Sequence, residues 1–324
     1  MSGHRGYVRY SDSVETRGAD EEEVIGKIIQ SMTQESQTVA ARDGRTVRAS
    51  HAKSTGLLKG ELRVLDSLPE PLRQGLFAAA RSYPIVVRLA QGPGEVLSDS
   101  VSTHRGMAIK GLEKSTGLPE AVKQAVSATS RATNAVVNAL GGDSPTFGFF
   151  GHTKRSPLAD AYFSQAALRH GDYIAKIGVF PVSPDLVAAI DSMLDTGADP
   201  NAFRTAVVDH FRTKGAEFEM RVQLCTSRDS MPVEDASVAW PEDESPYVAV
   251  ARLVLPPQNA YSPARQAYFD EVLSFQPAHA LAAHRPLGSL MRARLQTYQA
   301  LSLYRHQQNN RSQVEPGAIE QIPD

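Results

Sequence analysis

Residues 286–307 read PLGSLMRARLQTYQALSLYRHQ, and this stretch decides which fold the sequence favours. On a helix, which advances about 100° per residue, one stripe about 80° wide collects Leu287, Met291, Arg294, Tyr298, Leu301 and Arg305. Apolar residues and a tyrosine are ordinary on the buried face of an amphipathic helix. The two arginines are not, because a guanidinium on an apolar stripe needs an anion or must extend to water.

The spacing of Arg294 and Tyr298 brings their side chains together on that face, because residues four apart are neighbours on a helix. A guanidinium beside the phenol would favour the phenolate and lower the pKa of Tyr298 from its ordinary value of about 10. A phenolate is a hard, anionic metal ligand. Arginine four residues before tyrosine is nevertheless a weak pattern. By itself it favours a simpler interpretation, an amphipathic surface helix whose arginine heads lie in water.

A second candidate site lies far upstream, in residues 46–53, TVRASHAK. The run Thr46–His51 has the composition of a strand, and alternation along a strand would place Arg48 and His51 on opposite sides of it. A neutral imidazole at this place can act as a general acid and base. A lone histidine is more often structural, so the residue gains meaning only from its neighbours.

A further arginine, Arg88, lies in PIVVRLA (84–90), a segment otherwise apolar enough to be a core strand. Together with Arg48 and Arg305 it makes three arginines in apolar settings. Three such guanidinium groups suggest a buried ligand with more than one negative charge, such as two carboxylates. The alternative is three separate surface ion pairs.

Composition excludes several classes of protein. The chain has 324 residues and a net charge of −2, so it lacks the overall basic character of nucleic-acid binders. The polar amino terminus lacks the apolar core of a secretory signal, and no apolar run of about 18 residues predicts a membrane span. The single cysteine, Cys225, excludes an intrachain disulfide and a multi-cysteine metal site. A reducing cytoplasm is the simplest compartment.

Periodicity and turn residues predict an α+β organisation. We expect a flexible arm at 1–20, one domain at 21–308 and a polar tail at 309–324. The expected strands are Thr46–His51, Leu57–Leu65, Ile85–Ala90, Met107–Ile109, Tyr173–Val182, Phe218–Cys225 and Tyr247–Leu255. The expected helices are Glu21–Ala41, Leu118–Leu140, Pro184–Leu194, Pro200–Lys214 and Pro286–Gln307. The pattern is a strand-rich core with helices at its edges and at the carboxyl end.

The motifs, taken in order, resemble those of the haem catalases. R-x-x-H-A-K begins at Arg48, V-V-R ends at Arg88, and R-G-M-A-I-K spans 105–110. R-x-x-x-Y, followed by arginine seven residues on, is similar to the catalase proximal helix. Order and spacing agree from about residue 45 to residue 307. The segments 163–177, 231–247 and 274–294 resemble a compact catalase-related subfamily, closer to small haem hydroperoxidases and allene-oxide-forming relatives than to the large catalases.

The resemblance implies a fold, a cofactor and a role for each residue. The fold would be the catalase-type antiparallel β-barrel with surrounding and carboxyl-terminal helices, and the cofactor haem b. His51 would be the distal histidine and Tyr298 the proximal ligand of the haem iron, held as phenolate by Arg294. The haem propionates would pair with Arg48, Arg88 and Arg305.

Three departures from the catalase pattern concern the distal side. The segment of type V-x-N-x-P-x-F, which carries a distal asparagine shortly after the R-G-M-A-I-K strand, is not found. Asn134 and Asn138 fall on the expected helix, and neither takes over that role. Ala90 stands where a hydroxyl usually supports the distal histidine. Ser50 precedes His51 where true catalases carry an apolar residue, and such a hydroxyl resembles the organic-hydroperoxide branch.

The resemblance implies a haem-dependent enzyme, catalase-like or peroxidase-like, acting on hydrogen peroxide or on organic (lipid) hydroperoxides. The alternative is a non-enzymatic haem-binding or peroxide-sensing protein with a degenerate distal pocket. A relative that no longer binds haem is a third interpretation, which the intact proximal motif argues against. The expected partners are the peroxide substrate and, as an option, further copies of the chain, with no nucleic acid and no membrane span.

Overall fold

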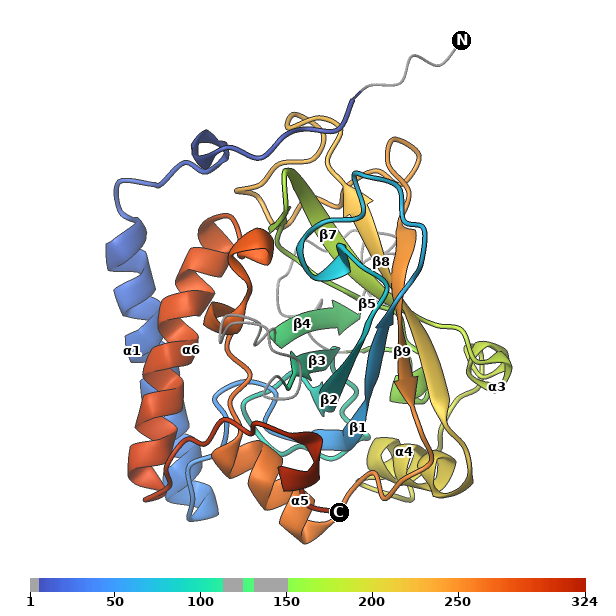
Figure 1. The fold of residues 1–324 in the computed structure, drawn as a ribbon. Helices are drawn as coiled ribbons and strands as arrows, with labels where there is room; N and C mark the ends of the chain where they lie inside the picture. Colours follow the sequence, from blue (N-terminus) through green and yellow to red (C-terminus); the bar gives the residue numbers. More distant parts are fainter. Residues whose placement is uncertain (1–5, 113–124, 131–150) are drawn as a thin grey trace.

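The computed structural model describes residues 6–112, 125–130 and 151–324. Nine strands form one antiparallel sheet in the order β5-β4-β3-β2-β1-β9-β8-β7-β6. Their bounds are β1 Ser54–Val64, β2 Ser82–Gln91, β3 Arg105–Gly111, β4 Ala125–Ser130, β5 Tyr162–Phe163, β6 Leu168–His170, β7 Tyr173–Pro181, β8 Ala216–Leu224 and β9 Val248–Leu255. Strand β5 also pairs with β7, with Phe163 opposite Gly178, so the pairings from β5 round to β7 close into a ring. The architecture is a curled antiparallel barrel with helices around it (Figure 1).

Alternation along the strands explains why the sheet curls around an apolar interior. Residues Ala216, Phe218, Met220 and Val222 of β8 are buried, whereas Glu217 and Glu219 between them are partly exposed. A strand with one face on the core requires this alternation. Strand β2 is buried on both faces through most of its length. It therefore has the barrel core on one side and covering segments on the other.

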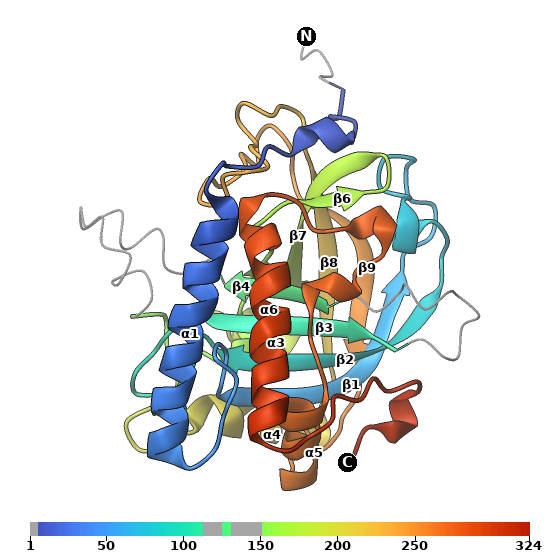
Figure 2. The same ribbon diagram turned by 90° about the vertical axis from the view of Figure 1, so that its left-hand side faces the viewer.

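Helices cover the base and two opposite sides of the barrel (Figure 1). These are α1 (Glu21–Asp43), α3 (Pro184–Ala188), α4 (Ala202–Thr213), α5 (Pro263–Ala267) and α6 (Ser289–Gln308). Helices α1 and α6 lie on one side and the short α3 on the other (Figure 1). Helices α1 and α6 pack side by side and cross in front of strands β1 to β3 (Figures 1 and 2). Helix α1 ends at Gly44, whose φ of 74° is left-handed and whose amide donates to the carbonyl of Ala40, the usual way to end a helix. Among the described helices, none is both long enough and apolar enough to cross a membrane.

Two expected elements are wrong. Residues 46–51 form no strand, because His51 has a left-handed φ of 56° and the first strand begins only at Ser54. The inference that alternation places Arg48 and His51 on opposite strand faces falls with it. Residues 125–130, inside the expected helix Leu118–Leu140, form β4, which pairs with β3. Pairing of backbone groups with a neighbouring strand overrides a helical pattern of side chains. The remainder of that expected helix, with Asn134 and Asn138, lies outside the described residues.

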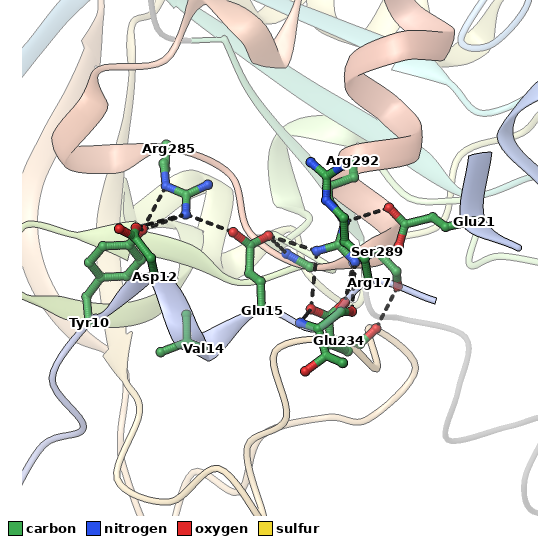
Figure 3. A network of polar contacts seen from close by, with 12 residues as sticks. Tyr10, Asp12, Val14, Glu15, Arg17, Glu21, Glu234, Arg285, Ser289 and Arg292 are labelled. Carbon is green, nitrogen blue, oxygen red and sulfur yellow. Dashed lines mark hydrogen bonds and ion pairs between the residues drawn. The ribbon is translucent and has the colours of Figure 1, made fainter. Parts of the chain in front are cut away.

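The described segments near the two ends of the chain pack against the rest of the domain. The amide of Thr16 donates to Glu234, and Val14 is buried. Figure 3 shows the charged cluster that joins this segment to the start of α6. At the other end, the carboxylate of Asp324 lies 2.7 Å from Lys59 Nζ, and Ile322 is buried in an apolar cluster with Leu57.

Candidate functional site

One cavity of about 340 Å³ lies between α1, α6 and the ends of β2 and β3. This volume falls within the range of small-molecule and cofactor pockets. Its lining includes every residue that the sequence singled out for the site, namely Arg48, His51, Arg88, Arg294, Tyr298 and Arg305. Arg48 and Arg305, which are 257 positions apart in the chain, therefore line the same cavity. The structure does not show the alternative of three separate surface ion pairs.

Helix α6 supplies the tyrosine side of the cavity. Arg294 Nη2 donates a 2.6 Å hydrogen bond to the phenol oxygen of Tyr298, and the guanidinium carbon lies 5.1 Å from the centre of the ring. The predicted contact across one helical turn is thus present. A charge-assisted bond to the oxygen stabilises the phenolate form over the phenol. Leu290 and Leu301, from the same helix, give this wall its apolar character.

Two of the three arginines, Arg48 and Arg88, share a single carboxylate, that of Asp270. Arg88 Nε donates to Asp270 at 2.9 Å, and Arg48 Nε lies 3.9 Å from the same oxygen. Arg48 also donates from Nη2 to the carbonyls of Phe269 and Leu273, at 2.6 and 2.8 Å. Burial, followed by repulsion from Arg305 and Arg88, lowers the pKa of Arg48 well below its usual value.

The same excess of positive charge acts on Arg305. Burial, only partly offset by the attraction of Asp270, lowers the pKa of Arg305 to about 10, and repulsion from Arg88 adds to the effect. Its Nη2 is 3.2 Å from His306 Nε2, a neutral acceptor rather than an anion. Two guanidinium nitrogens, Nε of Arg48 and Nε of Arg305, are buried with no hydrogen-bond partner. Buried donors without acceptors are costly. A ligand carrying two carboxylates, as haem does, would fit both the unbonded donors and the charge.

His51 stands in a strained and well-held conformation. Its φ of 56° is rare for a residue with a side chain, and such strain occurs mainly where the surrounding structure fixes it for function. The amide of His51 donates to Gly92 at 2.9 Å, and its carbonyl accepts from Arg88 Nη2 at 2.7 Å. Position 106, which lies against the His51 ring, requires glycine, because a Cβ there would lie 2.7 Å from Cε1 of the imidazole.

The imidazole of His51 is neutral and oriented. Burial lowers its pKa to about 3, with further contributions from His104, Arg88 and Arg294. Its Nδ1 lies 3.1 Å from the carbonyl of Gln91, which can only accept, so we assign the proton to Nδ1 and leave Nε2 as the free acceptor. This is the form that a general base requires at neutral pH.

Two residues of the site escaped the sequence analysis. Asp270 lies in a π-helical turn, Tyr268–Val272, and nothing in its local sequence marks it as the shared counter-ion of Arg48 and Arg88. His104 lines the cavity beside His51. Its position immediately before the R-G-M-A-I-K motif was the one available signal. Ser50 also lines the cavity, and its hydroxyl donates to the carbonyl of Gly92 at 3.3 Å.

Within the described ranges, no group of three or more His, Cys, Asp or Glu side chains is arranged to hold a metal ion. No protein-family model matches the chain. No curated protein matches it either.

Two solved catalases share this architecture. A fungal catalase superposes with a TM-score of 0.62 at 14% identity, covering 89% of this chain and 70% of its own. Catalase A from Saccharomyces cerevisiae superposes with a TM-score of 0.58, also at 14% identity, covering 84% of this chain and 65% of its own. At this identity the likeness concerns the fold alone. The chain has a catalase-like α+β fold, as the order of its motifs predicted, and it spans about two thirds of the length of these catalases.

Proposed function

We propose that the chain binds haem b with Tyr298 as the iron ligand and acts on hydrogen peroxide or organic hydroperoxides. One observation carries the proposal. A single cavity is lined by a phenol bonded to a guanidinium, by a buried imidazole of lowered pKa, and by three arginines, two of which contact the carboxylate of Asp270. A catalase-like fold surrounds it.

Each group has a task in this function. The phenolate of Tyr298, stabilised by Arg294, would hold the iron from α6, and tyrosine is the proximal ligand type of catalases. Arg48, Arg88 and Arg305 would bind the two propionates, which would supply acceptors for the unbonded Nε donors of Arg48 and Arg305. When bound, the haem supplies the redox chemistry of the O–O bond.

Proton movement falls to His51. Its free Nε2 takes the proton from one oxygen of the hydroperoxide and returns it to the other as that oxygen leaves. The carbonyl of Gln91 keeps the ring in the required tautomer, and the Arg88 bond to the His51 carbonyl holds the backbone in place. Apolar lining from α1, Ile28 and Met32, limits water in the cavity.

A second candidate function is haem binding or peroxide sensing without turnover. It is favoured by the composition of the wall, because the described residues that line the cavity include no asparagine. A positioned hydrogen-bond donor beside the peroxide is worth about 100-fold or more in rate, so loss of the distal asparagine would slow the reaction unless another polar residue of the wall replaces it.

Haem titration and two activity assays test these functions. Purified full-length protein is titrated with haemin and its Soret absorption recorded. The loaded protein is then assayed with hydrogen peroxide and with a fatty-acid hydroperoxide side by side. Tight haem uptake with turnover of either substrate supports the enzyme. Tight uptake without turnover favours the binding protein, and absence of a Soret band after loading overturns both.

A further inference from the structure

A second histidine, His104, lies beside His51 on the wall of the cavity. The two ring centres are 5.7 Å apart and the ring planes cross at 82°. The chain makes room for this imidazole, because a Cβ on Gly92 would overlap the His104 ring. The amide of Gly92 also donates to the carbonyl of His104 at 2.8 Å, which fixes the backbone on which the ring is carried.

A hydroperoxide presents two oxygens to this wall, and one imidazole cannot serve both at once. Nδ1 of His51 is bonded to the carbonyl of Gln91, so of the two ring nitrogens only Nε2 is left to bind a hydroperoxide. While Nε2 accepts from one oxygen, a different group must hold the other. The hydroxyl of Ser50 is directed to the carbonyl of Gly92, and Ala90 has no polar side-chain atom.

We propose that His104 is a second binding residue for the hydroperoxide, which hydrogen-bonds the leaving oxygen while His51 moves the proton. The inference rests on the proposed function, because it requires a peroxide in the cavity. No bond forms or breaks at the His104 ring. Its effect is to place the O–O bond and to stabilise the oxygen on which charge develops, the kind of contribution that a positioned hydrogen-bond donor makes.

His152 provides a matched control in the same row of rings. It lies 6.1 Å from His104, ring centre to ring centre, and is 3% exposed. It does not line the cavity. A substitution there disturbs the packing of His104 without removing a group that a ligand can touch.

The test uses His104→Gln, His104→Phe and His152→Gln in the haem-loaded full-length protein. Glutamine keeps a hydrogen-bonding group and loses the aromatic ring, whereas phenylalanine keeps the ring and loses the hydrogen bond. The first readout is the cyanide dissociation constant from the Soret shift, because bound cyanide accepts hydrogen bonds from the same groups. The second is kcat/KM for the better hydroperoxide substrate.

We expect His104→Phe to weaken cyanide binding about 10- to 100-fold, the factor that corresponds to one hydrogen bond to a charged group. kcat/KM should fall by a similar factor. His104→Gln should recover most of both, and the loss in His152→Gln should be clearly smaller than that in His104→Phe, because His152 does not line the cavity. If the phenylalanine variant does not fold, judged by circular dichroism, His104→Leu takes its place.

Four results would overturn the inference. If His104→Phe binds cyanide and turns over substrate as well as His104→Gln or better, His104 is a packing residue. A loss in His152→Gln equal to that in His104→Phe would place the effect outside the cavity wall. Normal Soret spectra with unchanged cyanide affinity in every variant would overturn the role of His104 alone. Failure of the parent protein to take up haem would overturn the proposed function and this inference with it.

Discussion

At the scale of single residues, the proposed haem binding depends on the phenol of Tyr298. Tyr298→Phe removes the ligand oxygen and also leaves Arg294 without its acceptor. We expect this variant to lose tight haem binding, while Arg294→Leu, which removes only the partner of the ligand, weakens it about 10- to 100-fold. Soret titration measures both. Tyr304→Phe, on the same helix but away from the cavity wall, is the control and should bind as the parent does. Tight binding by Tyr298→Phe would contradict the ligand assignment.

His51 can be tested without disturbing its backbone. Asparagine tolerates a left-handed φ better than most residues, so His51→Asn removes the imidazole while keeping the backbone conformation at this position. Haem binding should persist and kcat should fall about 100- to 10,000-fold, the usual contribution of a general acid and base. Stopped-flow assay of peroxide consumption measures the loss. A variant that retained full turnover would show that another group moves the proton.

At the scale of elements, one arginine ties α1 to α6. Arg292 of α6 donates to Glu21 at the start of α1 through two bonds of 2.7 Å, and to Glu15 and Glu234 at 2.9 Å each (Figure 3). Its side chain is only 11% exposed. The hydrogen bonds to these carboxylates, that of Glu21 first, raise the pKa of Arg292 above its ordinary value. In return, the guanidinium lowers the pKa of Glu21 and, against the opposing effect of burial, that of Glu234.

Replacement of Arg292 should therefore loosen α1. Arg292→Gln leaves Glu21 and Glu234 without their main cation and leaves Glu15 with Arg285 alone, and we expect a loss of about 3 kcal/mol in the free energy of unfolding. Because α1 supplies Ile28 to the cavity wall, haem should also dissociate faster. Urea unfolding and the transfer of haem to apomyoglobin measure the two effects. Arg17→Gln, whose side chain is 73% exposed and 4.0 Å from Glu22, should cost less than about 1 kcal/mol. Equal effects of the two variants would refute the role of Arg292.

At the scale of the whole molecule, buried neutral histidines set the response to acid. Burial lowers the pKa of His170 to about 4 and of His284 to about 3, and these two rings pack on Phe77 inside the barrel wall. His51 is lowered to about 3 in the same way. In the unfolded chain these groups titrate near pH 6.5. Below that pH the unfolded state binds more protons, so the stabilisation present above it is lost as pH falls from about 6.5 toward 3 to 4.

The expected result is a steep decline in stability between pH 6.5 and pH 4. Each buried histidine contributes up to about 1.4 kcal/mol per pH unit in that window. Urea midpoints at several pH values measure the slope. His170→Phe, which keeps a ring beside Phe77, should reduce the slope by about one proton. A midpoint that stays flat from pH 6.5 to pH 4 would contradict the buried neutral state.

Sequence patterns by themselves determined whatever depends on neighbours along the chain. The contact of Arg294 with Tyr298 follows from helix geometry and is present, and alternation located β7, β8 and β9 to within about two residues. The ordered motifs also indicated a catalase-like fold, which the superposed structures confirm. The residues proposed for the site were chosen from the same motifs, although their roles stay predictions.

Tertiary structure alone decided what depends on contacts between distant segments. Closure of the barrel brings together the ends of β2 and β3, the turn that carries Asp270, and helix α6. This arrangement makes Asp270 the shared counter-ion of Arg48 and Arg88 and places His104 beside His51. Pairing with β3 made a strand of residues 125–130. The bond from Arg88 to its carbonyl helps hold His51 at a φ that strand periodicity does not foresee. The physical reason is common to all of them, because long-range burial and hydrogen bonding outweigh local preference wherever the two disagree.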